Sequence, residues 1–303
     1  MNNSDSAPLI IEDRLPLIGA HVGSSGGLSR SVGRANQIGA NCMQIFVSAP
    51  RQWKTPVHSD KEVEAFCSQL AELDVRPVFL HAVYLLNPSG PDGDLRGKSV
   101  ESIREYLRWG ARLGAAGVVV HLGSSAGIAP EEAADNLCAG LLAALEVGGD
   151  VPLLLETSAG TKNSMGSTFG SLGSMLRRLD VGDRAAVCLD TAHVWAAGYD
   201  VASPDGLDRT LDEFEREIGL EKLLLIHAND SKVALGAARD RHENIGDGCI
   251  GLEGWSTLMS HPKLRHKPWI METPGPDKNG PDAAQVELLR ALWRGELPLV
   301  VTE

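Results

Sequence analysis

The stretch from Cys188 to Asp200 carries the clearest chemical signal in the sequence. A short apolar run, Ala185 to Leu189, predicts a buried strand, and Asp190 follows it directly. His193 comes three residues later, so the carboxylate and the imidazole are expected to lie close together. Such a pair suits a metal ion, but taken alone it is explained equally well by an Asp–His hydrogen bond at the start of a loop.

The same pattern recurs along the chain: apolar runs repeatedly end in a residue whose side chain can bind a metal. The residues at the ends of the predicted third to eighth strands are His81, His121, Glu156, Asp190, His227 and Glu272. The spacings Asp190-x-x-His193 and Asp240-x-His242 add three candidates. Each lone histidine is more often structural, whereas the joint pattern is much harder to obtain by accident. Converging carboxylates would raise one another's pKa unless a cation lay among them.

The composition of this candidate set indicates which metal it would bind. Five histidines with four carboxylates favour zinc, or a similar borderline ion, over magnesium or calcium. Nine ligands are too many for one tetrahedral ion, but two or three ions could share them through bridging carboxylates. Metal clusters with ions about 3.5–4 Å apart serve the hydrolysis of phosphodiesters.

The elements that must position these residues alternate between strand and helix. Strands are predicted near 15–22, 42–47, 76–80, 117–120, 151–155, 185–189, 222–226 and 268–271, and helices near 28–38, 60–73, 98–113, 130–145, 207–218 and 283–294. Residues 229–251 are predicted as a polar loop. Eight strand–helix units fit an α/β fold of the (β/α)8 TIM-barrel type, in a single domain with its site at the carboxyl ends of the strands. A doubly wound open sheet is the alternative, but no dinucleotide-type glycine fingerprint follows the first strand.

Composition and charge set limits on compartment and partners. The chain has 303 residues with a formal net charge of 28 − 40 = −12, a poor balance for a nucleic-acid binder unless bound cations offset it. Five scattered cysteines without a C-x-x-C spacing favour a reducing, cytoplasmic location. Residues 1–14 lack the features of a secretory signal and are predicted to be a flexible tail before a domain at 15–303. No apolar run approaches the length of a membrane span.

Two loops add candidates for nucleic-acid contact. Arg51-Gln52-Trp53 and Tyr84-Leu85 follow the second and third strands, hence on the same face as the metal candidates. They could probe a groove and wedge between bases. An ordinary loop with a partly buried tryptophan explains them about as well.

At this point the chain resembles the endonuclease IV family, the zinc-dependent apurinic/apyrimidinic (AP) endonucleases also called deoxyribonuclease IV, from about Leu15 to the last helix. The motifs that carry the resemblance are, in order, Gly19-Ala20-His21-Val22 with Gly26-Gly27, Arg51-Gln52-Trp53, His81 with Tyr84-Leu85, His121-Leu122-Gly123-Ser124, Glu156-Thr157, Cys188 to His193, His227 to Lys232, Asp240 to Gly246, and Glu272-Thr273-Pro274. Such a series of matches in order is highly specific.

The resemblance implies a full set of ligands for three zinc ions. They would be His81, His121 and Glu156 for the first ion, Glu156, Asp190, His227 and Glu272 for the second, and His193, Asp240 and His242 for the third. It also implies a TIM barrel that bends double-stranded DNA, flips out an abasic sugar and cuts 5′ to it, leaving a 3′-hydroxyl and a 5′-deoxyribose phosphate. Glu272 and the bridging Glu156 would be catalytic, with Glu272 orienting or deprotonating the attacking water. Arg51, Tyr84 and Leu85 would insert into the DNA, and we expect a monomer.

The loop after Glu156 departs from the family pattern, because Thr161 stands where a glutamine is usual. This difference bears on contacts to the damaged site more than on the metal chemistry. Two other functions remain open. A sugar isomerase or epimerase on a related barrel generally uses one or two ions held mainly by carboxylates, and the set His193, Asp240 and His242 argues against it. A non-catalytic damage-binding protein is disfavoured by the complete ligand set.

Overall fold

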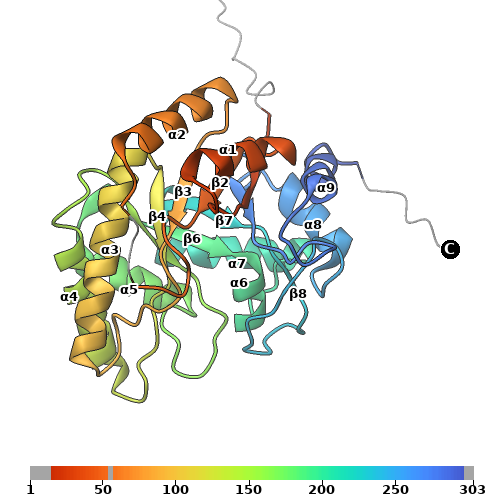
Figure 1. Cartoon of the computed structure of the whole chain (residues 1–303). Coiled ribbons are helices and arrows are strands. Elements are labelled where there is room, and N and C mark those ends of the chain that lie inside the picture. Colours follow the sequence, from red (N-terminus) through yellow and green to blue (C-terminus); the bar gives the residue numbers. More distant parts are fainter. Residues whose placement is uncertain (1–14, 54–56, 297–303) are drawn as a thin grey trace, which may run out of the picture.

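A closed barrel of parallel strands lies at the centre of the molecule (Figure 1). The computed structural model describes residues 15–53 and 57–296, and the predicted tail at 1–14 lies outside them. Within these residues the barrel strands are β1 (Ile18–His21), β2 (Cys42–Ile45), β3 (Val78–His81), β4 (Gly117–Val120), β5 (Leu153–Glu156), β6 (Ala185–Asp190), β7 (Leu223–His227) and β10 (Trp269–Met271). They pair in the order β1-β10-β7-β6-β5-β4-β3-β2, which closes the sheet on itself. The predicted TIM barrel is confirmed.

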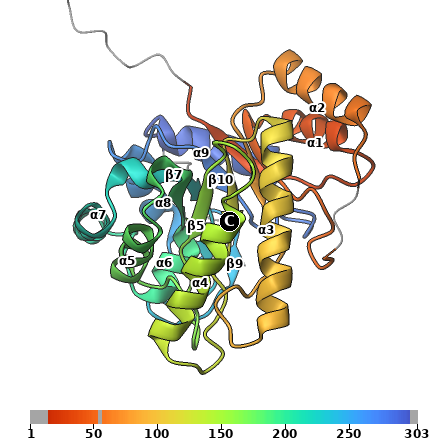
Figure 2. The same ribbon diagram turned by 90° about the vertical axis from the view of Figure 1, so that its left-hand side faces the viewer.

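Helices surround the barrel on its outside, and Figure 2 shows them from a second direction. They are α1 (Leu28–Gln37), α2 (Asp60–Glu72), α3 (Gly93–Leu113), α4 (Pro130–Ala144), α5 (Phe169–Leu179), α6 (Thr191–Ala197), α7 (Pro204–Glu217), α8 (Gly251–Ser260) and α9 (Ala283–Trp293). Two large apolar clusters fill the space between these helices and the strands. None of the helices in the described residues combines the length and the apolar character that crossing a bilayer requires.

Local sequence signals explain where several helices begin. Ser59 and Glu62 form a capping box at the start of α2, because each side chain bonds the backbone N–H of the other. Asp92 accepts a hydrogen bond from the N–H of Leu95 and begins α3, five residues before the start predicted at residue 98. The prediction missed this start because Gly93 and Gly97 lower the helix propensity of the first turn.

The structure also contains elements that the sequence did not predict. Helices α5, α6 and α8 were missed, and the predicted polar loop at 229–251 contains a small antiparallel pair, β8 (Asp230–Ser231) with β9 (His242–Glu243). In α5 the glycines weaken the helical pattern, yet Gly173 is required there. A Cβ at this position would lie 2.0 Å from the carbonyl oxygen of Glu217.

The barrel interior explains why chemistry gathers at one end of it. A cluster of buried, inward-facing side chains fills its centre: Cys42, Phe79, Val119, Leu154, Ala186, Cys188, Leu225 and Ile270. Side chains alternate between the two faces of a strand, so the residue two positions later faces inward again, one layer higher. Applied to each strand, and to Gly19 in β1, this rule gives His21, Gln44, His81, His121, Glu156, Asp190, His227 and Glu272. The barrel therefore places one polar residue per strand in a ring at its carboxyl end.

Candidate metal centre

The first group of candidate ligands joins three neighbouring strands. His81 ends β3, His121 follows β4, and Glu156 ends β5. The Oε2 atom of Glu156 lies 3.3 Å from Nε2 of His81 and 3.0 Å from Nδ1 of His121. Nε2 of His81 and Oε2 of Glu156 are both buried, and neither finds a hydrogen-bond partner among the residues that the structure describes. Two unpartnered buried atoms that face each other mark a place for a further group.

The second group forms around the other oxygen of Glu156. Nδ1 of His227 lies 3.0 Å from Oε1 of Glu156, 3.4 Å from Oε2 of Glu272 and 3.8 Å from Oδ2 of Asp190. These four residues each offer a ligand atom within 4.8 Å of the others. Glu156 thus presents one oxygen to each of two groups, which is the arrangement a bridging carboxylate needs.

The third group depends on the two loops that follow β6 and β7. Asp190 caps α6 by accepting the N–H of His193 (2.9 Å), which fixes His193 one turn after the strand as predicted. Asp240 lies between two imidazoles, with its oxygens 3.3 Å from Nε2 of His193 and 3.2 Å from Nε2 of His242. Oδ2 of Asp190 lies 3.6 Å from the same nitrogen of His242. Asp190 therefore connects the third group to the second.

These distances test whether zinc fits the residues present. Zinc–ligand bonds of about 2.0–2.2 Å in a tetrahedron separate neighbouring ligand atoms by about 3.3–3.6 Å. The contacts between candidate ligands in the three groups run from 3.0 to 3.9 Å. All nine residues predicted from the sequence take part in them. The set of nitrogen and oxygen donors, and its spacing, fit three zinc ions.

The electrostatics of the groups point the same way. Burial would lower the pKa of His193, but Asp190 and the hydrogen bond to Asp240 raise it to about 10. The pKa of His242 rises to about 9 for the same reasons. Burial would raise the pKa of Glu272, yet the facing His227 and the hydrogen bond from His21 hold it below its usual range. The carboxylate of Glu272 is thus kept ionised and favours positive charge beside it.

Hydrogen bonds behind the ligands fix their orientation. Nδ1 of His81 donates to the carbonyl of Ala82 (2.7 Å), and Nδ1 of His193 donates to the carbonyl of Thr157 (2.8 Å). In each ring the opposite nitrogen faces a carboxylate, and it is the nitrogen that loses its proton when the ring is neutral and binds a cation. Asn229 donates to Oδ2 of Asp190 (2.7 Å). Such outer partners set the tautomer and direction of metal ligands.

From the sequence we predicted no role for Gln44, and His21, Thr157 and Asn229 entered only as members of the family motifs. Thr157 directly follows Glu156, and Asn229 stands two residues after His227. Their positions in the sequence therefore do not indicate a separate role. His21 and Gln44 could have been found, because both satisfy the same two-residue step from the barrel layer that places the ligands.

The predicted DNA-contacting residues lie on loops at the same mouth. Tyr84 is 52% exposed, and its ring centroid lies 5.6 Å from that of His81 and 5.7 Å from that of His121. Its backbone N–H donates to the carbonyl of Pro50, which ties this loop to the one that carries the exposed Arg51. Leu85 is half-buried and packs against the apolar core. Tyr84 and Arg51 are thus available to a ligand that covers the metal groups.

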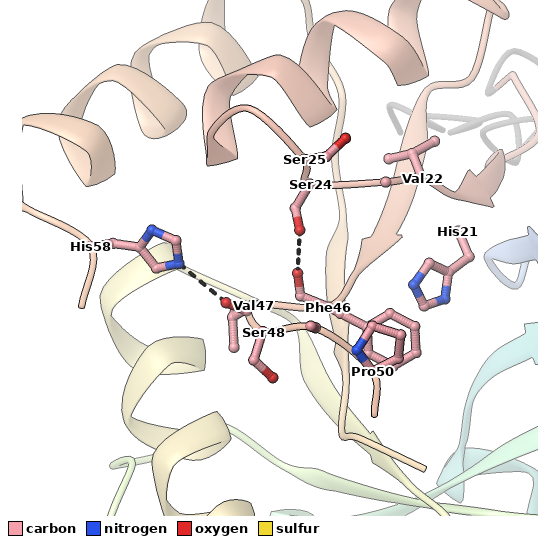
Figure 3. A pocket seen from close by; sticks show the side chains of 11 residues that line it. His21, Val22, Ser24, Ser25, Phe46, Val47, Ser48, Pro50 and His58 are labelled. Atoms are coloured by element: carbon pink, nitrogen blue, oxygen red, sulfur yellow. Dashed lines mark hydrogen bonds between the residues drawn. The ribbon is translucent and has the colours of Figure 1, made fainter. Parts of the chain in front are cut away.

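Two hollows open near the metal groups. One, of about 260 Å³, lies over the first and third groups and is lined by Tyr84, His121, Asp240 and the loop residue Thr161. A larger one, of about 540 Å³, lies to the side between the loops after β1 and β2. Figure 3 shows His21 beside the ring of Phe46 in this larger hollow, with centroids 4.3 Å apart. The smaller hollow is the one that reaches the candidate ligands directly.

Known proteins similar to this chain share one fold, the TIM barrel. Residues 32–292 match the family model described as a xylose isomerase-like TIM barrel. A probable endonuclease 4 from Chloroflexus aggregans is 38% identical over 282 residues, which cover 92% of this chain and 99% of that protein. The solved endonuclease IV from Thermus thermophilus has a TM-score of 0.82 and 35% identity, and the match covers 92% of this chain and 100% of that one. A D-tagatose 3-epimerase-like protein (TM-score 0.68, 19% identity, 91% and 97% covered) shares the fold alone.

Proposed function

The chain belongs to the endonuclease IV family, and we propose on that premise that it cuts the phosphodiester 5′ to abasic sites in double-stranded DNA. It is a metal-dependent DNA-cleaving hydrolase of DNA repair. The proposal names three zinc ions and an abasic duplex as the cofactor and the substrate. Its main support is the close approach of nine acid and imidazole groups from far apart in the sequence.

The proposed ligand sets follow the three groups. His81, His121 and Glu156 hold the first ion, and Glu156 joins it to the second. Asp190, His227 and Glu272 complete the second set, and His193, Asp240 and His242 form the third. When bound, zinc would lower the pKa of the attacking water and neutralise charge on the phosphate and on the leaving oxygen.

The chain's own residues carry the remaining tasks. Glu272 directs Oε2 into the second group while Oε1 is held from behind, so we assign it the orientation of the attacking water and acceptance of its proton. Glu156 is the second catalytic residue, because its two oxygens keep two groups in register. Arg51, Tyr84 and Leu85 are proposed to enter the duplex beside the lesion. Exposed aromatic and basic side chains above a reactive mouth suit stacking on bases and contact with phosphates.

The proposal extends to the state of the protein in the cell. We propose a monomer with one catalytic domain at 15–303, preceded by a tail at 1–14. We also propose that it works in the cytoplasm. Its five cysteines, all within the described residues, are free thiols, which suits a reducing compartment.

A sugar epimerase is the second candidate, because barrels of similar shape carry that activity. The third ligand group disfavours it. His193 lies in α6, and Asp240 and His242 lie in the segment after β7, all beyond the ends of the barrel strands. Asp240 contacts the two histidines at 3.2–3.3 Å. A site that binds one or two metal ions does not require this third ligand group.

A cleavage assay tests the proposal. The substrate is a 5′-labelled duplex with one tetrahydrofuran abasic site, and the controls are the intact duplex and the zinc-loaded protein treated with a chelator. We expect metal-dependent cutting 5′ to the site with a 3′-hydroxyl product. Glu272→Gln should lower turnover by at least about 100-fold while DNA affinity changes little. Absence of cutting by the loaded wild type, or near wild-type turnover in Glu272→Gln, would count against the assignment.

A further inference from the structure

Gln44 occupies the ring of polar residues at the barrel mouth without belonging to any ligand group. It lies one layer above Cys42 on β2, and it is fully buried. Its Oε1 atom lies 2.9 Å from Nε2 of His227, and its Nε2 atom lies 2.7 Å from Oε1 of Glu272. A neutral side chain buried between two candidate ligands that sit on different strands needs an explanation beyond packing.

The bond to His227 repeats a pattern seen at two other histidines. His81 and His193 each donate one ring N–H to a main-chain carbonyl, and the opposite nitrogen faces a carboxylate. In His227 the two ring nitrogens exchange these roles. Nε2 donates to Gln44, and Nδ1 faces Glu156 and Glu272. Here the acceptor is a side chain, so the interaction can be removed by substitution.

The bond to Glu272 fixes the orientation of the amide. With its carbonyl toward the N–H of His227, Gln44 directs its NH2 group at the carboxylate of Glu272. The flipped amide would set two donors against each other at His227 and two acceptors against each other at Glu272. The same NH2 nitrogen lies 2.9 Å from Nδ1 of His21, which itself lies 3.1 Å from Oε1 of Glu272. One orientation therefore satisfies both partners.

We propose that Gln44 is a positioning residue that sets the tautomer of His227 and the direction of the Glu272 carboxylate together. Because a donor and an acceptor on one rigid amide plane hold both residues, the second metal group is assembled before metal or DNA arrives. The effect on turnover rests on the proposed function, whereas the effect on metal affinity does not.

Two substitutions separate the two contacts. Gln44→Met keeps the length and unbranched shape but removes both. Gln44→Glu keeps an acceptor for His227 and replaces the donor with a charge that faces Glu272. Cys42→Ala is the control, since it lies on the same strand and inner face, one layer below the site. Thermal melts of the zinc-free proteins check that each variant folds.

Zinc affinity is measured by competition with a chromophoric chelator, and the geometry of the second group by the visible spectrum of the cobalt-loaded protein. Gln44→Met should bind zinc about 10–100-fold more weakly and show an altered cobalt spectrum. Its kcat on the abasic duplex should fall at least about tenfold with KM unchanged, because a fully buried side chain does not meet DNA. Gln44→Glu should retain more of the zinc affinity than Gln44→Met, because the contact to His227 remains, and should still lose kcat. Cys42→Ala should match the wild type in all of these measurements.

The outcomes distinguish this inference from the function on which it rests. If the zinc-loaded wild type cuts no abasic DNA, the proposed function fails, and the zinc affinities and cobalt spectra still judge Gln44. If the wild type cuts, and Gln44→Met matches it in zinc affinity, spectrum and kcat, the positioning role is refuted. A Gln44→Glu variant that loses zinc as Gln44→Met does, or that keeps full kcat, would also refute it. Should Gln44→Met fail to fold, Gln44→Glu carries the test alone.

Discussion

The carboxylate of Asp230 offers the sharpest test of how the third ligand group is held. It is fully buried, and both of its oxygens accept hydrogen bonds. Oδ1 accepts from the backbone of Ser231 (2.7 Å) and Ile250 (2.9 Å), and Oδ2 accepts from the backbone of Gly246 (3.0 Å) and Gly251 (3.2 Å) and from the Trp255 indole (3.1 Å). These donors lie at both ends of the loop that carries Asp240 and His242. Asp230 is therefore the anchor of that loop.

Replacement of Asp230 by Asn gives a magnitude that can be worked from these bonds. The new NH2 group replaces one oxygen and faces at least two N–H donors, which are then left unsatisfied. Each costs about 1–3 kcal/mol, so the two cost about 2–6 kcal/mol, and the cheaper burial of a neutral amide favours the lower half of that range. We expect a loss of about 3 kcal/mol, or about 5 °C in the melting midpoint for a chain of this length.

The variant should also lose one metal ion in preference to the others. The carboxylate of Asp230 forms no hydrogen bond with a candidate ligand of the first two groups, so Asp230→Asn should retain two zinc ions per chain after dialysis where the wild type retains three. Zinc content and melts of the zinc-free protein provide the two readouts. Asp247→Asn, an exposed change in the same loop, is the matched control and should alter neither. A midpoint within about 1 °C of wild type together with full zinc content would show that Asp230 does not hold the loop.

Three further predictions follow from exposure, metal binding and packing. Tyr84→Ala should weaken binding to an abasic duplex by about tenfold in fluorescence anisotropy, because stacking on a base contributes about 1–3 kcal/mol. The melting midpoint should stay unchanged, because the ring is half-exposed. Unchanged binding with a lowered midpoint would make Tyr84 a structural residue. Removal of zinc by a chelator should abolish cutting and lower the melting midpoint, because each site filled at a thousandfold excess over Kd adds up to about 4 kcal/mol to the free energy of unfolding. Added zinc should restore both, and cutting by metal-free protein would contradict this. Gly19→Ala should destabilise the barrel by about 1–3 kcal/mol in urea unfolding, since its Cβ would lie 1.9 Å from the carbonyl oxygen of Cys42. Gly33→Ala should not destabilise it, because an added Cβ there would meet no described atom within 4 Å apart from its chain neighbours and the backbone of its own helix.

The sequence was most informative where a strand ends. Apolar runs of about five residues located every barrel strand within a few residues, and the polar residues after six of these runs are the candidate ligands at the strand ends. This worked because a parallel barrel turns strand ends into spatial neighbours regardless of their distance along the chain. His193 followed from the same argument, since it stands one turn after Asp190.

The sequence was less informative where tertiary contacts determine the local structure. Helix α5 was missed because Gly173 breaks the expected pattern, although the close backbone of Glu217 demands a glycine there. The pair β8–β9 was read as loop because Asp230, rather than an apolar pattern, organises it. Gln44 was overlooked because an amide in a strand carries no chemical signal until its two partners are known.

Anomalous diffraction at the zinc edge, from crystals of the zinc-loaded protein, tests the proposed three-ion site most directly. We expect three peaks at the carboxyl end of the barrel: one among His81, His121 and Glu156, one beside His227 and Glu272, and one beside His193 and Asp240. Fewer than three peaks at this mouth in fully loaded crystals, or peaks bound elsewhere with these side chains turned apart, would contradict it.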